Sequence, residues 1–225
     1  MTWTVTERTL PSGAVPVLAF LQGLTGDAKA EAIAALKLVA ERGNALRAPV
    51  SKALGDGLFE LRGRTSGVRI FYTFKPGRVI VLLDGVVKKR GDIPPSRPRA
   101  NATAADGGGV MSRVMQWIDE ELTKDARLAS KVEGELARLR LEQDLVTLRE
   151  GRGLSQRQLA RIVGVSQPVI ARIETGRAGN LELRTLIKIA AALDSEVHIT
   201  FRRRRPAEQR QAPARSQRRG SRPTP

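Results

Sequence analysis

A 16-residue stretch near the middle of the chain, Pro95–Val110, divides the sequence into two parts of different character. It reads PSRPRANATAADGGGV, and its prolines and three consecutive glycines disfavour both helix and strand. The residues before it show the short apolar runs typical of strands, and the residues after it show the spacing of helices. The sequence therefore predicts a folded unit at 1–94, a flexible linker at 95–110 and a second unit at 111–201.

The chain is strongly basic, and the excess charge is unevenly distributed. Of its 225 residues, 39 are Lys or Arg and 23 are Asp or Glu, which gives a formal net charge of +16. Residues 202–225 hold nine basic residues against one acidic residue and lack the apolar residues that a core needs. We expect this tail to be disordered and to bind phosphates without sequence preference. The overall charge favours a polyanionic partner such as nucleic acid.

Missing residue types exclude several kinds of site. The chain has no cysteine, which excludes thiol nucleophiles, disulfides and Cys-ligated metals, and its one histidine, His198, excludes mechanisms that need a histidine pair. We expect neither a metal nor a cofactor. No apolar run approaches the ~20 residues that span a bilayer. The start has no secretory signal, so we expect a soluble, cytoplasmic protein.

The first unit is predicted to be a small α+β domain. A helix is predicted over Asp27–Gly43, followed by three strands at Leu58–Arg62, Val68–Phe74 and Arg78–Leu83. Val5–Leu10 can add an edge strand. One or two helices would pack on this antiparallel sheet.

Strand alternation places charged side chains on one face of the predicted sheet. Glu60 and Arg62 point away from Phe59 and Leu61. Arg69 likewise lies opposite the face that carries Val68, Ile70, Tyr72 and Phe74. Arg62, Arg69 and Lys88–Arg90 can therefore converge on one side. An ordinary solvated sheet face is the simpler alternative.

The order of four segments in this unit resembles the HigB-like branch of the RelE toxin superfamily. The segments are LRAPVSKAL, GDGLFELRGR, SGVRIFYTF and VIVLLDGVVKK, within about residues 3–95. The resemblance implies a metal-independent ribonuclease that cleaves mRNA, generally on the ribosome. Arg62 and Arg69 match the basic strand residues of that superfamily, and Lys88 and Lys89 match its closing basic pair.

The cutting of RNA by its own 2′-hydroxyl needs a base as well as cations at the phosphate. With no histidine in this unit, the base would be a carboxylate, a lysine of lowered pKa or Tyr72. Glu60 and Tyr72 are weaker candidates for catalytic residues than the four basic residues. Two features depart from the family. Prolines stand where relatives continue into a C-terminal helix, and Asp84 replaces an uncharged or histidine residue. A catalytically inactive domain is therefore the alternative.

The most informative segment of the second unit is LSQRQLARIVGVSQPVIARIETGR, Leu154–Arg177. Ser155 and Gln158 form a capping box at the start of one helix, Gly164 allows a turn, and Ser166 caps a second helix. This spacing predicts a helix-turn-helix. The helix that begins at Ser112 is expected to break at Gly134.

Further elements are expected on either side of this segment. A leucine stripe at 141, 145 and 148 precedes it. A helix at Asn180–Leu193 and a short strand at Val197–Phe201 follow it.

Over residues 111–201 the sequence resembles XRE-type helix-turn-helix proteins, and HigA-type antitoxins in particular. The recognition helix would be Gln167–Thr175. The predicted base-edge contacts are Ser166, Gln167, Val169 and Arg172. Gln156, at a helix start, matches a phosphate-contacting position.

Toxin first and antitoxin second is the gene order of HigBA systems. The resemblance implies a fused toxin–antitoxin protein: a latent mRNA endonuclease masked by a DNA-binding domain that represses its own promoter. Its partners would be operator DNA, mRNA on the ribosome and the other half of the chain, and one helix-turn-helix per chain argues for a homodimer. The alternative is a helix-turn-helix transcriptional regulator with a catalytically dead, toxin-like interaction domain.

Overall fold

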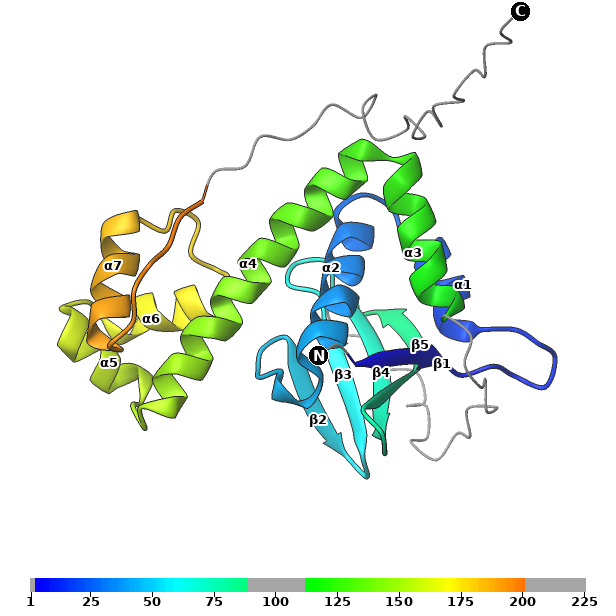
Figure 1. Ribbon diagram of the computed structural model, residues 1–225, viewed down its shortest axis with the longest axis horizontal. Helices are drawn as coiled ribbons and strands as arrows, with labels where there is room; N and C mark the ends of the chain where they lie inside the picture. Colours follow the sequence, from blue (N-terminus) through cyan, green and yellow to red (C-terminus); the bar gives the residue numbers. More distant parts are fainter. Residues whose placement is uncertain (1–2, 89–111, 201–225) are drawn as a thin grey trace, which may run out of the picture.

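The first half of the protein is built on a five-stranded sheet. The computed structural model describes residues 3–88, here called the first half, and residues 112–200, the second half (Figure 1). The strands are β1 (Thr4–Glu7), β2 (Ser51–Gly55), β3 (Leu58–Arg62), β4 (Val68–Lys75) and β5 (Val79–Val87). They lie in the order β1-β5-β4-β3-β2. β1 runs parallel to β5, and the other neighbours are antiparallel.

The predicted α+β class is confirmed, and the alternation of apolar residues located β1, β3, β4 and β5 to within a few residues. Strand β2 was missed because Ser51–Gly55 shows no clear alternation of apolar and polar residues. Its register with β3 holds it at the edge of the sheet.

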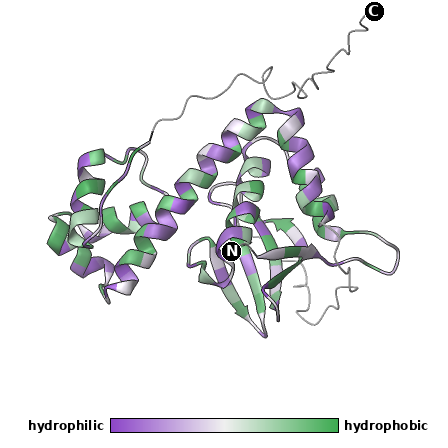
Figure 2. Ribbon diagram, in the orientation of Figure 1, coloured by the Kyte–Doolittle hydropathy of each residue, from purple (hydrophilic) through white to green (hydrophobic). Residues whose placement is uncertain are grey.

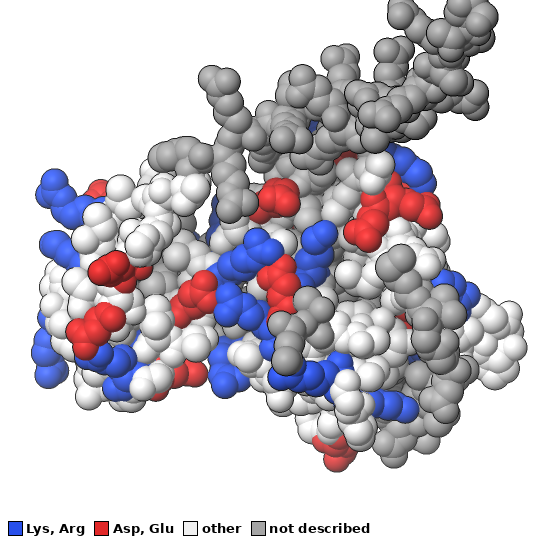
Figure 3. Space-filling model, viewed as in Figure 1, with Lys and Arg blue, Asp and Glu red and all other residues white. Residues whose placement is uncertain are grey.

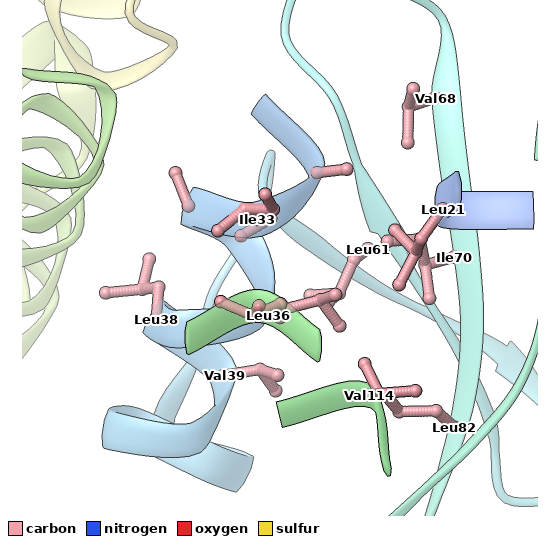
Figure 4. Close-up of a cluster of buried hydrophobic side chains, with 14 of the residues drawn as sticks. Leu21, Ile33, Leu36, Leu38, Val39, Leu61, Val68, Ile70, Leu82 and Val114 are labelled. Carbon is pink, nitrogen blue, oxygen red and sulfur yellow. The ribbon is translucent and has the colours of Figure 1, made fainter. Parts of the chain in front are cut away.

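Helices α1 (Pro16–Gln22) and α2 (Gly26–Arg42) cover one face of the sheet (Figure 1). Ile33 and Leu36 of α2 are fully buried in the core that forms there (Figure 4). The predicted helix at Asp27–Gly43 is thus confirmed. Gly43 ends it, because the backbone there has a φ of +52° and the Trp3 ring leaves no room for a Cβ atom.

All secondary-structure elements of the second half, within residues 112–200, are helices. The helices are α3 (Arg113–Lys124), α4 (Ala126–Gly151), α5 (Gln156–Val163), α6 (Gln167–Glu174) and α7 (Leu183–Ala192). Apolar and polar residues alternate along the long helix α4 (Figure 2). This helix runs from beside α2 to the helix-turn-helix part (Figure 1).

Two expectations for the second half are wrong. The helix does not break at Gly134, which lies inside α4; the break falls at Asp125, whose carboxylate accepts hydrogen bonds from the backbone N–H groups of Arg127 and Leu128. The strand expected at Val197–Phe201 is absent, since residues 197–200 form no strand and are exposed. Phe201 lies outside the described residues, as do the predicted linker at 95–110 and the tail at 202–225.

Helix α3 and much of α4 are buried against the first half. Val114, Ile118, Val132, Leu136 and Leu139 are all at most 4% exposed and belong to the same apolar cluster as the buried side chains of α2 and the sheet. Figure 4 shows Val114 close to Leu82 of β5. The apolar core of the first half is therefore completed by residues that follow position 111.

The helix-turn-helix part has its own, smaller core. Leu145 from the end of α4 packs there with Leu159, Ile170, Ile173 and Ile189. Helix α4 thus contributes to both cores and connects them.

Candidate nucleic-acid interfaces

The face of the sheet opposite α1 and α2 carries the predicted catalytic cations. Leu61 and Ile70 belong to the core on the helix side, whereas Leu58, Phe71, Val81 and Leu83 form a separate apolar cluster on the opposite face. The register pairs Arg62 with Arg69 and Arg69 with Val86. Because side chains alternate between faces, both arginines lie on the face away from the helices.

Lys88 joins these arginines at the same end of the sheet. Its backbone N–H donates to the carbonyl of Gly67 at 2.9 Å, in the hairpin that connects β3 and β4, and its side chain is exposed. We call Arg62, Arg69 and Lys88 the cationic edge. Lys89 lies outside the described residues. The structure brings the three described cations together, and their role in catalysis stays a prediction.

Arg69 is held against the backbone of the hairpin. Its Nη1 donates to the carbonyl of Val68 at 2.8 Å and lies 3.5 Å from that of Gly63. Burial lowers the pKa of Arg69, the carboxylate of Glu60 raises it, and the charge of Arg62 lowers it, so that the net shift is downward. An arginine nevertheless stays protonated in a protein, so this side chain is a fixed cation.

Glu60 and Tyr72 differ sharply in position. Glu60 lies on the face of the cationic edge, where its Oε1 accepts a hydrogen bond from Arg62 Nε at 2.7 Å and forms an ion pair with Nη2 at 2.5 Å. Tyr72 is fully buried on the helix side and shares a 2.7 Å hydrogen bond with the hydroxyl of Ser51. Burial raises the pKa of Tyr72 to about 12. Tyr72 is therefore poorly suited to act as the base, because it lies on the other side of the sheet from the cationic edge and its raised pKa keeps it protonated.

The hairpin beside the cationic edge carries a residue that sequence reasoning missed. Arg64 donates from Nη1 to the carbonyl of Gly176 at 2.6 Å and from Nε to Glu135 Oε1 at 3.3 Å. Both partners belong to the second half. No spacing rule relates residues 71 and 112 positions apart, so only the sequence Arg62-Gly63-Arg64, with a second arginine just beyond the end of β3, hints at this position.

The second candidate interface is the helix-turn-helix. Ser155 and Gln158 form the predicted capping box at the start of α5, and Gly164 ends that helix in the left-handed conformation, with a φ of +76°. Ser166 precedes α6 as predicted, but its side chain makes no capping hydrogen bond. The two-helix unit is thus confirmed, with one cap fewer than expected.

A chain of polar contacts fixes α5 and α6 against the end of α4. Arg149 makes a two-point pair with Glu174, at 2.6 and 3.0 Å, and this hydrogen bonding raises the pKa of Arg149. Gln156 Nε2 donates to the same carboxylate at 3.0 Å, and Gln167 Nε2 donates to Gln156 Oε1 at 2.8 Å. Such a connected network orients both glutamines at the starts of their helices.

The other predicted DNA-binding residues are not equally accessible. Ser166 and Arg172 are exposed, whereas Val169 is half-buried and packs against the helix-turn-helix core. Figure 3 shows basic side chains gathered around this part of the molecule, on the left of the view. Exposed basic residues of this part include Arg152, Arg157, Arg161, Arg172, Arg177, Arg184 and Lys188. These positions suit contacts with phosphate groups.

Residues 3–88 and 112–200 contain neither a metal-binding cluster nor a helix that could span a membrane. No cluster of His, Asp or Glu in these ranges could hold a metal ion. No helix in them is long and apolar enough to cross a membrane.

Each half matches a known protein family. Residues 19–104 match the family described as Phage derived protein Gp49-like (DUF891), and residues 145–198 match the family described as Helix-turn-helix. An uncharacterized HTH-type transcriptional regulator from Haemophilus influenzae is 45% identical over 62 residues, which make up 28% of this chain. The match spans 62% of that protein, less than two thirds of its length.

A toxin–antitoxin module from Streptococcus pneumoniae has been solved, and this chain resembles it at 31% identity with a TM-score of 0.31. The match covers 37% of this chain and 89% of that one. The chain therefore carries a Gp49-like domain followed by a helix-turn-helix domain of the kind found in transcriptional regulators.

Proposed function

We propose that this chain is a fused toxin–antitoxin protein of the cytoplasm. The Gp49-like half would be a latent, metal-independent, HigB-like mRNA endonuclease. The HigA-like half would inhibit it and repress its own promoter. The observation that carries the proposal is the burial of α3 and α4 against the first half, since an inhibitor must bind the domain that it controls.

Charge complementarity between the halves supports the same function. Figure 3 shows basic and acidic side chains side by side near the centre of the molecule. Seven ion pairs join first-half and second-half residues: Lys29–Glu121 (3.0 Å), Arg42–Asp144 (2.8 Å), Lys131–Asp27 (2.6 Å), Arg140–Glu41 (2.5 Å), Arg47–Glu150 (3.7 Å), Arg113–Glu7 (3.5 Å) and Arg64–Glu135 (3.3 Å). Together with the buried apolar residues of α3 and α4, these ion pairs make the contact between the halves specific as well as extensive.

The proposed chemistry uses the cationic edge. The 2′-hydroxyl of RNA would attack the adjacent phosphate, and Arg62 and Arg69 would stabilise the charge that develops on it. Glu60 is better placed than the buried Tyr72 to act as the base, once RNA phosphate draws Arg62 away from its carboxylate. Lys88 is exposed and can give a proton to the leaving oxygen.

Inhibition would not require the second half to cover the cationic edge. Helices α3 and α4 pack on the helix side, against α2, α1 and β1, and not on the face with Arg62 and Arg69. We infer that the bulk of the helix-turn-helix part keeps the toxin domain from its site on the ribosome.

The helix-turn-helix half would bind operator DNA as a homodimer. Helix α6 would enter the major groove, with Gln167 and Arg172 at base edges and Ser166 at its start. Gln156 would lie near the phosphates. The hydrogen bond between Gln156 and Gln167 would preorganise the Gln167 side chain for DNA binding.

The test compares three proteins induced in bacterial cells: residues 1–110, the full chain, and residues 1–110 with Arg69→Ala. Growth and mRNA integrity are measured. We expect the fragment to stop growth and to cut mRNA, and the other two proteins to be harmless. Co-expression of residues 111–225 should rescue growth. A fragment that is soluble and folded but harmless would refute the endonuclease.

A second function is favoured by the Glu60–Arg62 pair. This pair neutralises one of the three cations, and the buried Tyr72 offers no base. Under this alternative the chain is a transcriptional regulator whose Gp49-like domain binds a partner without cutting RNA. Operator binding would then persist while neither the fragment nor its Arg69→Ala variant affected growth.

A further inference from the structure

Arg64 stands at the end of the cationic edge but faces the second half. Its neighbour Gly63 donates to the carbonyl of Val68 at 2.8 Å, and Arg69 Nη1 lies 3.5 Å from the carbonyl of Gly63. Arg64 therefore lies one residue beyond a backbone group that Arg69 contacts. Its side chain is 23% exposed, and Nε and Nη1 are occupied by Glu135 and Gly176.

The hairpin that presents Arg64 is firmly anchored. Glu31 of α2 accepts hydrogen bonds from the backbone and hydroxyl groups of Thr65 and Ser66, at 2.5 to 3.2 Å. Burial raises the pKa of Glu31, but these hydrogen bonds outweigh it and leave the pKa below its usual value. The backbone at Arg64 is thus held in place, and only its long side chain is free to change partners.

The second half offers Arg64 a group of oxygen atoms. Glu135 pairs with it directly, and Glu142 is 3% exposed, with an Oε1 that makes no hydrogen bond within the described part of the chain. A Cβ atom placed on Gly176 would lie 2.1 Å from that Oε1 and 2.9 Å from Arg64 Cδ. One carboxylate and one carbonyl thus bind the Arg64 guanidinium, and the carboxylate of Glu142 lies beside Gly176, close to the same side chain. Arginine donors bind phosphate oxygens in the same way.

We propose that Arg64 is a further RNA-phosphate-binding residue of the cationic edge, and that the second half withholds it by occupying its donors. This inference rests on the proposed function. It gives the second half a direct electrostatic effect on the RNA site, although α3 and α4 do not cover that site. When the halves separate, the Arg64 side chain is free to turn toward Arg62 and Arg69 and to contact the same strand of RNA.

The test uses the full chain and a variant that removes the competing charges. Glu135→Gln with Glu142→Gln keeps the size of both side chains while abolishing their attraction for Arg64. The probe is a fluorescein-labelled, mixed-sequence single-stranded RNA of about 16 nucleotides, titrated at several salt concentrations. The helix-turn-helix and the basic tail are the same in every variant, so only differences between variants are interpreted.

We expect the double variant to bind RNA about tenfold more tightly than the unchanged chain. The slope of log Kd against log salt should steepen by about 0.7, as for one added phosphate contact on a single strand. Arg64→Ala in the double variant should return both values to those of the unchanged chain, while Arg64→Lys should keep the steeper slope.

Arg47→Ala is the matched control, because Arg47 also pairs with α4 but through Glu150, away from the hairpin. If Arg47→Ala or Arg64→Ala alone tightens binding as much as the double variant does, Arg64 only ties the halves together and the inference is wrong. Thermal melting of each variant checks that it is folded.

Arg69→Ala in the double variant separates the inference from the proposed function. If it leaves RNA binding unchanged, the cationic edge is not the RNA site, and the proposed function and the inference both fail. If it weakens binding while Arg64→Ala does not, only the inference fails.

Discussion

The helix-turn-helix and the cationic edge are both candidate nucleic-acid interfaces, but they are held together in different ways. The polar network of the helix-turn-helix, from Arg149 to Gln167, joins residues at most 25 positions apart along the chain. In the hairpin beside the cationic edge, Glu31 of α2 anchors the backbone, but the Arg64 side chain is bound by Glu135 and Gly176, which are 71 and 112 positions away. One interface is therefore preorganised by its own segment, whereas the other adjoins an arginine side chain that the opposite half of the chain binds.

The largest effect on stability should come from disrupting the apolar cluster to which both halves contribute. Val132→Asp places a charge at a position that is 1% exposed, and we expect a loss of about 5 kcal/mol or more in the free energy of unfolding. Urea unfolding followed by the fluorescence of Trp3 and Trp117 measures it. Arg127→Asp, at an exposed position of the same helix, should change little. An unchanged transition for Val132→Asp would mean that the apolar contact between the halves adds little to the stability of the full chain.

A somewhat smaller effect should be confined to the helix-turn-helix. Arg149→Ala leaves the buried Glu174 without its cation, and we expect a loss of about 3–5 kcal/mol together with loss of DNA binding. Arg152→Ala removes the exposed pair with Asp194 and should cost less than about 1 kcal/mol. Melting curves and DNA titrations compare the two. Equal losses in both variants would contradict the preorganised network.

The free energy of unfolding should depend on pH through Glu142, a buried residue of α4. Burial raises the pKa of Glu142 to about 7; Arg64 and Arg138 lower it, and Glu135 raises it. Because this pKa lies above the value of an unfolded chain, the associated stability is present at low pH and is lost as the pH rises from about 4.5 through 7. The loss should reach about 3 kcal/mol.

Glu142→Gln should abolish this dependence. Urea unfolding of both proteins at about pH 5 and about pH 8 measures the difference that belongs to Glu142 alone. The comparison is needed because Glu31, with its lowered pKa, acts in the opposite direction at more acidic pH. Parallel curves for the two proteins would show that Glu142 does not titrate in this range.

The smallest effect on stability should come from removing a local capping interaction in the helix-turn-helix. Ser155→Ala removes a capping box, and we expect a loss of about 1 kcal/mol in the stability of that part. Ser166→Ala is the matched control, because the Ser166 side chain makes no capping hydrogen bond and its loss should be near zero. The melting temperatures of the two variants, compared with that of the unchanged chain, measure the two losses. A larger loss for Ser166→Ala would reverse the assignment of the caps.

Sequence patterns succeeded where the stabilising interactions are local. The capping box at Ser155, the turn at Gly164 and the strands β3 to β5 follow from residues within a few positions of one another. They failed where burial overrode a local preference. Gly134 lowers helix propensity by about 1 kcal/mol, but flanking residues such as Val132 and Leu136 bury enough apolar surface on the first half to keep α4 continuous.

The sequence by itself determined that the chain has two parts, an α+β part with a row of basic strand residues and a helix-turn-helix part. These features depend on periodicity and capping, which act over a few residues. Only the tertiary structure decided that α4 completes the core of the first half, that Tyr72 points away from the arginines, and that Arg64 is held by Glu135 and Gly176. The physical reason is that close packing and charge pairing depend on distance in space, and residues more than a hundred positions apart meet only when the chain has folded.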